Sequence, residues 1–289
     1  MKRLVINADD FGADRGRTSG IMEAIEQGVV TSVSLLADGN DFKEAVASLR
    51  GTHGSGISVG IHLNLSEGRP IAKGLRLLVN NDGMFRGKSK ALSLFQKSPA
   101  KALAEEIDRE IEAQVERVLE AGLEVTHLDG HQHVHLFPAV LHGALRAAKR
   151  YGVTWVRLPL EDPPLFVGQG DPLAEEAMFF LNQAFGARRF IAESGIRTTD
   201  HFRGLFLKGR IDQNSLLATV EGLPSGHTEL MVHPGRASHP MSQDAFGTFG
   251  TKDRERELEA LLSESFRRRL EVLNIQLVSF KEATTGGLE

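Results

Sequence analysis

Short runs of apolar, β-branched residues alternate along the chain with longer amphipathic segments. The run from Arg3 to Ala8 is typical of a buried strand, and the stretch from Ile57 to Leu65 alternates as a half-buried strand does. The expected strands are 3–8, 29–36, 57–65, one beginning at 125, 154–159, a short one near 201–202, 228–232 and 275–280. The expected helices are 19–27, 41–49, 99–121, one opening at Pro138, 175–185, 213–222 and 254–273.

The helix expected after residue 98 has the clearest periodicity. Its apolar residues recur every three or four positions, at Leu103, Ile107, Ile111, Val115 and Val118. Ser98 and Pro99 predict its start as N-cap and first helical residue, and Gly122 predicts its end. Its opposite face is charged, so we interpret the helix as a packing element without chemistry of its own.

The alternation of strands and helices predicts a parallel α/β fold. The chain has 289 residues, and about seven strands over that length favour a TIM-like barrel over an open sheet. There is no internal repeat, domain linker or low-complexity segment, so we expect a single domain over residues 1–289. Residues 66–98 are rich in Gly, Asn, Asp and Lys and are expected to form a long loop or small insertion.

Composition narrows the chemistry. The net charge is −4 and lacks the basic excess of a nucleic-acid binder. There is no cysteine, so any metal must be held by His, Asp, Glu or backbone oxygen. The longest apolar runs fall short of the ~20 residues of a membrane span, and the N-terminal run is too short for a signal peptide. A cytoplasmic location is the default expectation.

Candidate metal ligands fall at the ends of three expected strands. Asp9 and Asp10 follow the first strand, His62 lies near the end of the third, and His131 follows the strand that begins at 125. In an α/β barrel, this end of the strands is where catalytic groups lie. Two histidines and one carboxylate suit a divalent ion and leave positions open for water and substrate. The alternatives are a helix N-cap for the aspartates and a structural role for His62.

The stretch from Val125 to His135 contains four of the eleven histidines and one carboxylate. In an extended strand, five side chains would share one face until the chain bends near Gly130, namely His127, Asp129, His131, His133 and His135. The stretch predicts a metal site, with a solvated histidine-rich loop as the alternative. We expect His131 to be the ligand and His135 a fallback, Asp129 and His133 to contact the ligands or the substrate, and His127 to be structural.

Three further residues would complete a hydrolytic site. Asp9 beside a metal-bound water is a natural general base, and His233, at the end of a later strand, is placed to donate a proton. Arg157 is expected to pair with Asp9 and hold it ionised. This set predicts hydrolysis of an amide or ester. Alternatively, Arg157 is a surface residue and His233-Pro234-Gly235 a simple turn.

Four motifs resemble the YdjC-like carbohydrate deacetylases, a family that includes chitooligosaccharide deacetylases and hopanoid-associated deacetylases. They are Ile6-Asn7-Ala8-Asp9-Asp10-Phe11-Gly12, Gly60-Ile61-His62-Leu63-Asn64, Asp129-Gly130-His131-Gln132-His133-Val134-His135 and Glu229-Leu230-Met231-Val232-His233-Pro234-Gly235. The motifs follow one another in family order, and the resemblance covers nearly the whole chain. Arg157-Leu158-Pro159-Leu160-Glu161 is similar to the hopanoid branch, whereas His233-Pro234-Gly235 fits the oligosaccharide branch equally well.

The resemblance implies a distorted (β/α) barrel, often a homodimer, that removes the acetyl group from an N-acetylated sugar or glycolipid. It implies that Asp10, His62 and His131 bind one divalent ion, Zn²⁺ or Mg²⁺. Through the related polysaccharide deacetylases it implies Asp9 as base, Arg157 as its orienting residue and His233 as acid. His133, Asp200 and His201 are the substrate-side candidates.

Two other functions remain open from the sequence. A different metal-dependent hydrolase, such as a phosphoesterase, would be favoured by two metals about 3.5–4 Å apart. A sugar-binding protein without activity would be favoured by tight sugar binding without turnover. The intact set of candidate catalytic residues argues for an enzyme.

Overall fold

The computed structural model describes residues 1–51, 56–164, 170–237 and 251–285. Its centre is a parallel sheet of eight strands within these ranges, in the order β5-β4-β3-β2-β1-β7-β6. The eighth strand, β8, pairs with the first residues of β1, whereas β2 pairs with the later ones. The strands are β1 (Lys2–Phe11), β2 (Ser32–Leu35), β3 (Ser58–Leu63), β4 (Val125–Gly130), β5 (Trp155–Val156), β6 (His201–Arg203), β7 (Gly226–Val232) and β8 (Ile275–Leu277).

The sheet curls into a half-barrel, which confirms the expected α/β class and distorted barrel. Its two edges approach each other at one isolated parallel bridge between Trp155 of β5 and Arg197, just before β6. There the Val156 amide donates to the Arg197 carbonyl at 2.9 Å, and the Arg197 amide to the Thr154 carbonyl at 3.1 Å. The strands on these two edges are short, so the barrel is distorted where it comes closest to closing.

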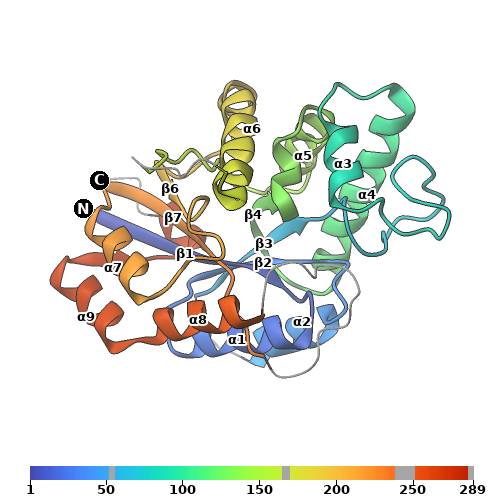
Figure 1. Cartoon of the computed structure of the whole chain (residues 1–289). Helices are drawn as coiled ribbons and strands as arrows, with labels where there is room; N and C mark the ends of the chain where they lie inside the picture. Colours follow the sequence, from blue (N-terminus) through green and yellow to red (C-terminus); the bar gives the residue numbers. More distant parts are fainter. Residues whose placement is uncertain (52–55, 165–169, 238–250, 286–289) are drawn as a thin grey trace.

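Helices surround the sheet (Figure 1). They are α1 (Arg15–Glu26), α2 (Phe42–Gly51), α3 (Lys88–Phe95), α4 (Lys101–Glu120), α5 (Pro138–Arg150), α6 (Pro172–Ser194), α7 (Gln213–Glu221), α8 (Thr251–Leu262), α9 (Glu264–Val272) and α10 (Phe280–Thr285), with the 3₁₀ segment η1 (His131–Leu136) after β4. In Figure 1, α1, α2 and α8 lie below the sheet and α3, α5 and α6 above it. None of the described helices is long and apolar enough to cross a membrane.

Two helix predictions need correction. The helix after residue 98 begins at Lys101, and Ala100 is its N-cap without a side-chain hydrogen bond, so Ser98 and Pro99 lie outside it. The helix expected over 254–273 is two helices, because Ser263 caps a new one and its side chain accepts the Phe266 amide. The 66–98 segment contains α3 and an antiparallel bridge between Val79 and Phe85.

Alternation along β1 builds the barrel interior in layers. Leu4, Ile6 and Ala8 belong to the main apolar core, whereas Val5 packs in a separate cluster with Trp155 and Phe280. The next residues of the same phase are Asn7 and Asp9, both buried. The interior therefore passes from an apolar floor to a polar middle and then to acidic side chains at the strand ends.

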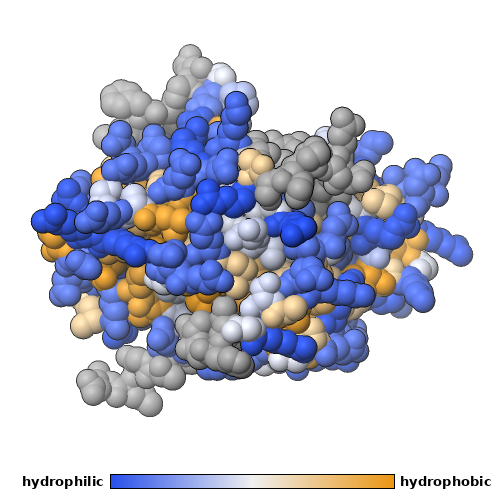
Figure 2. Space-filling model, turned by 90° about the horizontal axis from the view of Figure 1, so that it is seen from below, coloured by the Kyte–Doolittle hydropathy of each residue, from blue (hydrophilic) through white to orange (hydrophobic). Residues whose placement is uncertain are grey.

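A view from below shows a largely hydrophilic outer face, with apolar side chains gathered toward the left, the side on which α7 and α9 lie in Figure 1 (Figure 2). The exposed large apolar residues of the described chain are Met1, Leu77, Leu173, Phe185, Phe190 and Val272. They are spread over separate elements, apart from the three on α6, so the buried polar groups inside the barrel are the feature that needs a functional explanation.

Candidate metal centre

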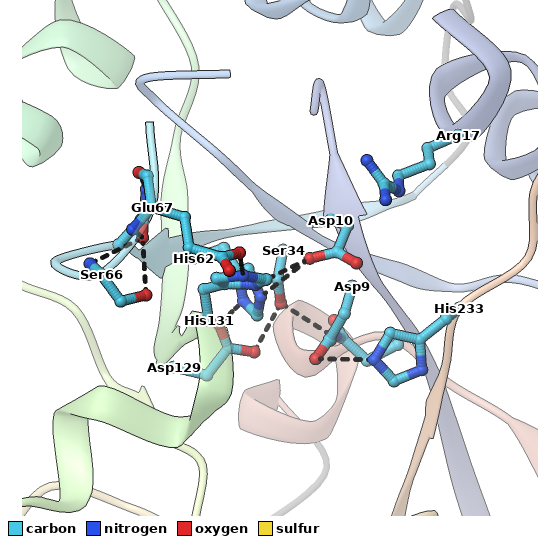
Figure 3. Close-up of polar contacts among 12 residues, drawn as sticks. Asp9, Asp10, Arg17, Ser34, His62, Ser66, Glu67, Asp129, His131 and His233 are labelled. Atoms are coloured by element: carbon cyan, nitrogen blue, oxygen red, sulfur yellow. Dashed lines mark hydrogen bonds and ion pairs between the residues drawn. The ribbon is translucent and has the colours of Figure 1, made fainter. Parts of the chain in front are cut away.

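A cavity lies at the carboxyl ends of the strands. Its polar lining comes from several elements and includes Asp9, Asp10, His62, Glu67, His131, His133 and His233. Figure 3 shows Asp10, His62 and His131 converging, with Asp9 and His233 beside them. The structure thus brings these predicted site residues together around one cavity.

The three expected ligands form a cluster that could hold a metal ion. One oxygen of Asp10 lies 3.0 Å from Nδ1 of His131 and 3.5 Å from Nε2 of His62. All three ligand atoms lie within 4.8 Å of one another. The side chains are nearly removed from solvent, with exposed fractions of 4% for Asp10, 2% for His62 and 12% for His131.

A bulge at the end of β1 brings both aspartates to the cavity. In a regular strand, adjacent side chains point to opposite faces. Here the pairing of β1 with β2 shifts register between Ala8 and Phe11, and Asp10 has a φ of 63°. Left-handed conformations are uncommon for residues other than glycine and cluster at functional sites. The bulge therefore turns Asp10 toward the same cavity as Asp9.

The turn after β4 separates the histidines that a straight strand would have aligned. Gln132 and His133 have φ values of 53° and 50°, and they reverse the chain within η1. His135 is carried away from the cluster and donates from Nε2 to the Arg157 carbonyl at 3.0 Å. The structure therefore does not bring His135, the fallback ligand, to this cluster. The five residues do not share one face because the chain bends directly after Gly130.

The other members of the stretch have distinct places. His127 is buried inside the barrel, 3.3 Å from the Ser34 hydroxyl, and its ring packs on Phe280. A Cβ at Gly60 would lie 2.2 Å from its Nε2, so only glycine fits opposite this ring. His133 lines the cavity against Phe180, with ring centroids 5.1 Å apart. The buried position of His127 is consistent with the structural role expected for it.

Carboxylates stand behind both histidines. His62 and Asp129 are register partners in β3 and β4, and His62 Nδ1 donates to Asp129 Oδ1 at 2.7 Å. His131 Nε2 lies 3.0 Å from Glu67 Oε2. A carboxylate behind a histidine fixes its ring and is common around metal ligands. Arg254 binds the other oxygen of Asp10 at 2.7 Å.

The charges of the site fit a bound cation. Burial alone would lower the pKa of His62, but Asp129, Asp9 and Asp10 together raise it to about 10. Burial likewise opposes protonation of His131, yet Asp10 and Glu67 raise its pKa. Both rings thus sit in a negative field with their inner nitrogens directed at one oxygen. A divalent ion would take the place of the protons that this field attracts.

Asp9, His62 and Asp129 form a second group of possible metal ligands, and Arg157 pairs with both of its carboxylates. Arg157 donates to both oxygens of Asp9 at 2.6 and 2.7 Å. The same guanidinium lies 2.7 Å from Asp129 Oδ2 and donates from Nε to Glu229 at 2.7 Å. The predicted pairing of Arg157 with Asp9 is present, and the arginine is buried. Its guanidinium therefore already pairs with both carboxylates of this group.

His233 lies on the other side of Asp9. Its Nε2 is 3.9 Å from Asp9 Oδ2, and its backbone amide donates to Glu257 Oε1 at 2.5 Å. Burial lowers the pKa of His233 to about 3, although Asp9 and Asp10 oppose that shift. The free site therefore holds this imidazole in its neutral form.

Asp200 and His201 do not line this cavity, so their assignment as substrate contacts needs correction. His201 pairs with Thr228, near the start of β7, and its Nε2 donates to the Ser225 carbonyl. Asp200 accepts the His227 amide at 2.8 Å. Strands in a parallel sheet run the same way, so the start of β6 lies at the opposite end from the cavity. The sequence around Asp200 and His201 does not indicate at which end of the strand these two residues lie.

Sequence reasoning missed several residues around the cavity. Glu67 and Lys88 come from the 66–98 segment, and Arg254 from α8. Lys88 and Lys208 both bind Glu176 of α6 at 2.7 Å on the cavity wall. The apolar part of the wall is formed by Leu173, Ala177, Phe180, Leu205 and Met231. Charged residues on amphipathic helices or in irregular segments usually face solvent, so nothing in their local pattern marked them.

The fold and this cluster define an α/β half-barrel with a candidate metal site at its strand ends. The YdjC-like protein family matches residues 3–272, and the chain belongs to this family. A carbohydrate deacetylase of Mus musculus is 36% identical, over 97% of this chain and 94% of its own. One of Brevibacillus brevis is 33% identical, over 97% of this chain and 99% of its own.

A solved structure extends the similarity to three dimensions. A crystal structure from Enterococcus faecalis V583, described as a candidate cellobiose-phosphate cleavage protein, is 25% identical to the chain. It has a TM-score of 0.73 and covers 97% of this chain and 98% of its own. Carbohydrate deacetylase relatives thus span nearly the full chain, and the whole fold is shared with a solved relative.

Proposed function

We propose that this protein is a metal-dependent hydrolase that removes the acetyl group from an N-acetylated sugar. The observation that carries the proposal is the cluster of Asp10, His62 and His131, with Asp9 beside it and paired with Arg157. The curated relatives named as carbohydrate deacetylases supply the reaction class. A sugar oligomer and a glycolipid headgroup both belong to the substrate class proposed.

The proposed ion is held by Asp10, His62 and His131. Two imidazoles and one carboxylate form a donor set that suits zinc better than magnesium, which prefers oxygen ligands. A divalent ion there would supply Lewis acidity toward a water and toward the acetyl carbonyl oxygen. Zn²⁺ is therefore our first choice and Mg²⁺ the second.

Asp9 is the proposed base. It accepts hydrogen bonds from Asn7 at 2.9 Å and from both terminal nitrogens of Arg157, which fix its orientation. In this role, Asp9 takes a proton from water as the water oxygen bonds to the acetyl carbon. The carbon–nitrogen bond then breaks, giving acetate and the free amine of the sugar.

His233 is the proposed acid for the leaving amine. Because burial keeps the free imidazole neutral, its proton must be acquired during turnover. Asp9, 3.9 Å away, is the group that has just gained one from water. The proposed sequence is therefore water to Asp9, Asp9 to His233 and His233 to the amine nitrogen.

A two-metal phosphoesterase has less support. Its second ion would need the carboxylates of Asp9 and Asp129, and both are bound by Arg157. A non-catalytic sugar-binding protein has less support as well, because the residues proposed as base, orienting arginine and acid all lie around the candidate metal site.

The test is a substrate panel for the full-length protein loaded with Zn²⁺ or Mg²⁺. We expect acetate release from N-acetylglucosamine oligomers or from a glycolipid bearing N-acetylglucosamine, and no phosphate release from a generic phosphomonoester. Phosphate release without acetate would support the phosphoesterase. Sugar binding without either product would support the binding protein, and both outcomes would contradict our proposal.

A further inference from the structure

Glu67 lies next to the candidate metal centre, although it belongs to a segment without a predicted element. Its Oε2 lies 3.0 Å from Nε2 of His131, and the opposite nitrogen of that ring lies 3.0 Å from Asp10. The Glu67 side chain is only 16% exposed, so water screens this contact little. The His131 ring therefore spans two carboxylates, one at each nitrogen (Figure 3).

A contact of this kind decides which nitrogen of an imidazole is available to a metal. The partner of one nitrogen fixes the proton there and leaves the lone pair on the other. Glu67 accepts from Nε2, so Nδ1 is the nitrogen that faces Asp10, and a metal bound there would replace the proton that Nδ1 shares with Asp10. His62 has the complementary arrangement, with Asp129 behind Nδ1 and Nε2 toward Asp10. The two rings thus turn one nitrogen each toward the same oxygen of Asp10.

The backbone of Glu67 is fixed by Asn64, the last residue of the motif that contains His62. Asn64 Oδ1 accepts the Glu67 amide at 3.2 Å, and Asn64 Nδ2 donates to the Glu67 carbonyl at 2.6 Å. Asn64 is fully buried, and its backbone is held by the side chain of Gln114 on α4. Gln114 Oε1 accepts the Asn64 backbone amide at 3.0 Å, and Gln114 Nε2 donates to the Asn64 backbone carbonyl at 2.6 Å. An exposed loop residue would lack this framework.

We propose that Glu67 is the positioning residue of His131 and that Asn64 acts through it. Glu67 holds the proton on Nε2, keeps Nδ1 directed at the metal and compensates charge behind the ring. This role rests on the metal site of the proposed function, but it concerns metal affinity and can be measured without turnover. It also gives a function to Asn64, which the reaction itself does not use.

Zinc affinity is the first readout. Full-length wild type, Glu67→Leu and Glu67→Gln are titrated with Zn²⁺ against a competing chelator, after circular dichroism has confirmed folding. We expect the Kd of Glu67→Leu to rise about 10–100-fold, as for other residues behind metal-bound histidines. Glu67→Gln should lose less, because its amide oxygen still accepts from Nε2. Glu105→Leu, on the exposed face of α4, is the matched control and should bind as wild type does.

The His131 ring gives a second, spectroscopic readout. In the zinc-loaded protein, ¹⁵N–¹H NMR of histidine should show a slowly exchanging proton on Nε2 of His131. That proton should exchange fast in Glu67→Leu and be partly protected in Glu67→Gln. General destabilisation would not produce this order.

A double-mutant cycle tests the part played by Asn64. Asn64→Ala should raise the Kd for zinc in the wild-type background and add little in the Glu67→Leu background, because residues in one network are not additive. A Kd in Glu67→Leu within about two-fold of wild type would overturn the proposal. So would a zinc X-ray absorption spectrum with one oxygen ligand fewer in that variant, since Glu67 would then be a ligand. If wild type bound neither zinc nor magnesium, the proposed function would fall with this role, whereas normal wild-type binding with an unaffected variant would overturn this role alone.

Discussion

Asp9 and Asp10 are neighbours in the chain but have different partners. Arg157 binds both oxygens of Asp9, whereas Arg254 binds one oxygen of Asp10 and leaves the other facing the two candidate histidine ligands. A guanidinium bound to both oxygens fixes the charge and orientation of a carboxylate. At the scale of single residues, the partners therefore suit Asp9 to accept a proton and Asp10 to bind a metal.

Arg157 is the residue on which the buried charges of the site depend. Substitution Arg157→Met would leave Asp9, Asp129 and Glu229 without their shared cation. Removing one partner of a buried ion pair costs about 3–5 kcal/mol. We expect a loss of that order in urea unfolding of the metal-free protein. Arg189→Met, from a solvent-exposed pair, should change stability by less than about 0.5 kcal/mol, and an equal loss in both variants would contradict the argument.

Glu161 gives a pH-dependent prediction away from the metal site. It accepts the Leu205 amide at 2.7 Å, and burial raises its pKa to about 7. A raised carboxyl pKa favours the folded state below the unfolded pKa, and this contribution is lost as pH rises through about 7. Glu161→Gln should therefore gain stability relative to wild type by on the order of 1–2 kcal/mol between about pH 5 and about pH 8. Thermal unfolding across this range measures it, and a pH-independent difference between the proteins would refute it.

At the scale of elements, α4 is more than a packing helix. Besides its apolar stripe it buries Glu106, Glu110 and Gln114, one turn apart. Glu106 accepts the amides of Arg76, Leu77 and Leu78, and Glu110 accepts those of Ile71 and Ala72. The helix thereby satisfies the backbone of a segment that has few hydrogen bonds of its own, and it supports the loop that carries Glu67.

This role of α4 can be tested with two adjacent residues. Glu106→Leu would leave three backbone amides without an acceptor, and each buried unsatisfied group costs about 1–3 kcal/mol. We expect a loss of several kcal/mol or local opening of the 71–78 segment, read by hydrogen exchange. Glu105→Leu changes a side chain that is 63% exposed and should leave both unaffected. Unchanged protection in Glu106→Leu would show that α4 does not hold this segment.

The sequence contained enough to predict the strands, the barrel and the place where the candidate ligands meet. Buried strands have a strong apolar signal, and Asp10, His62 and His131 directly end three of them. It did not reveal the bulge at Asp10 or the left-handed turn at Gln132, because both depend on neighbouring strands. The sequence also did not show that Glu106 is buried whereas Glu105 is exposed. The pattern of apolar and polar residues is the same whether a carboxylate contacts solvent or accepts hydrogen bonds from backbone amides.

At the scale of the whole molecule, the barrel interior is layered. Val5, Trp155 and Phe280 close its lower part, and the buried ion pairs of Arg157 lie nearer the strand ends. The cavity opens above them, between the strand ends and α6. An apolar floor and a charged, largely dry middle layer keep water out from below, so a metal at the top would meet solvent and substrate from one side only.

Metal binding should therefore stabilise the entire fold. A ligand that binds only the folded state adds about 2.7 kcal/mol when present at a hundred times its Kd. We expect chelation to lower Tm by several degrees and added Zn²⁺ to restore it. Asp10→Asn should show little response to either treatment. If neither the chelator nor zinc changed the Tm of wild type, this result would count against a metal site in this cluster.

The central claim is that a metal held by Asp10, His62 and His131 works with Asp9 as base. The most direct measurement is acetate release per bound metal from N-acetylglucosamine oligomers, by wild type and by Asp9→Asn, with zinc content determined on the same samples. We predict that Asp9→Asn keeps its zinc and loses about 10²–10⁴-fold in rate. Full activity of Asp9→Asn, or no acetate from zinc-loaded wild type with any such sugar, would contradict the account.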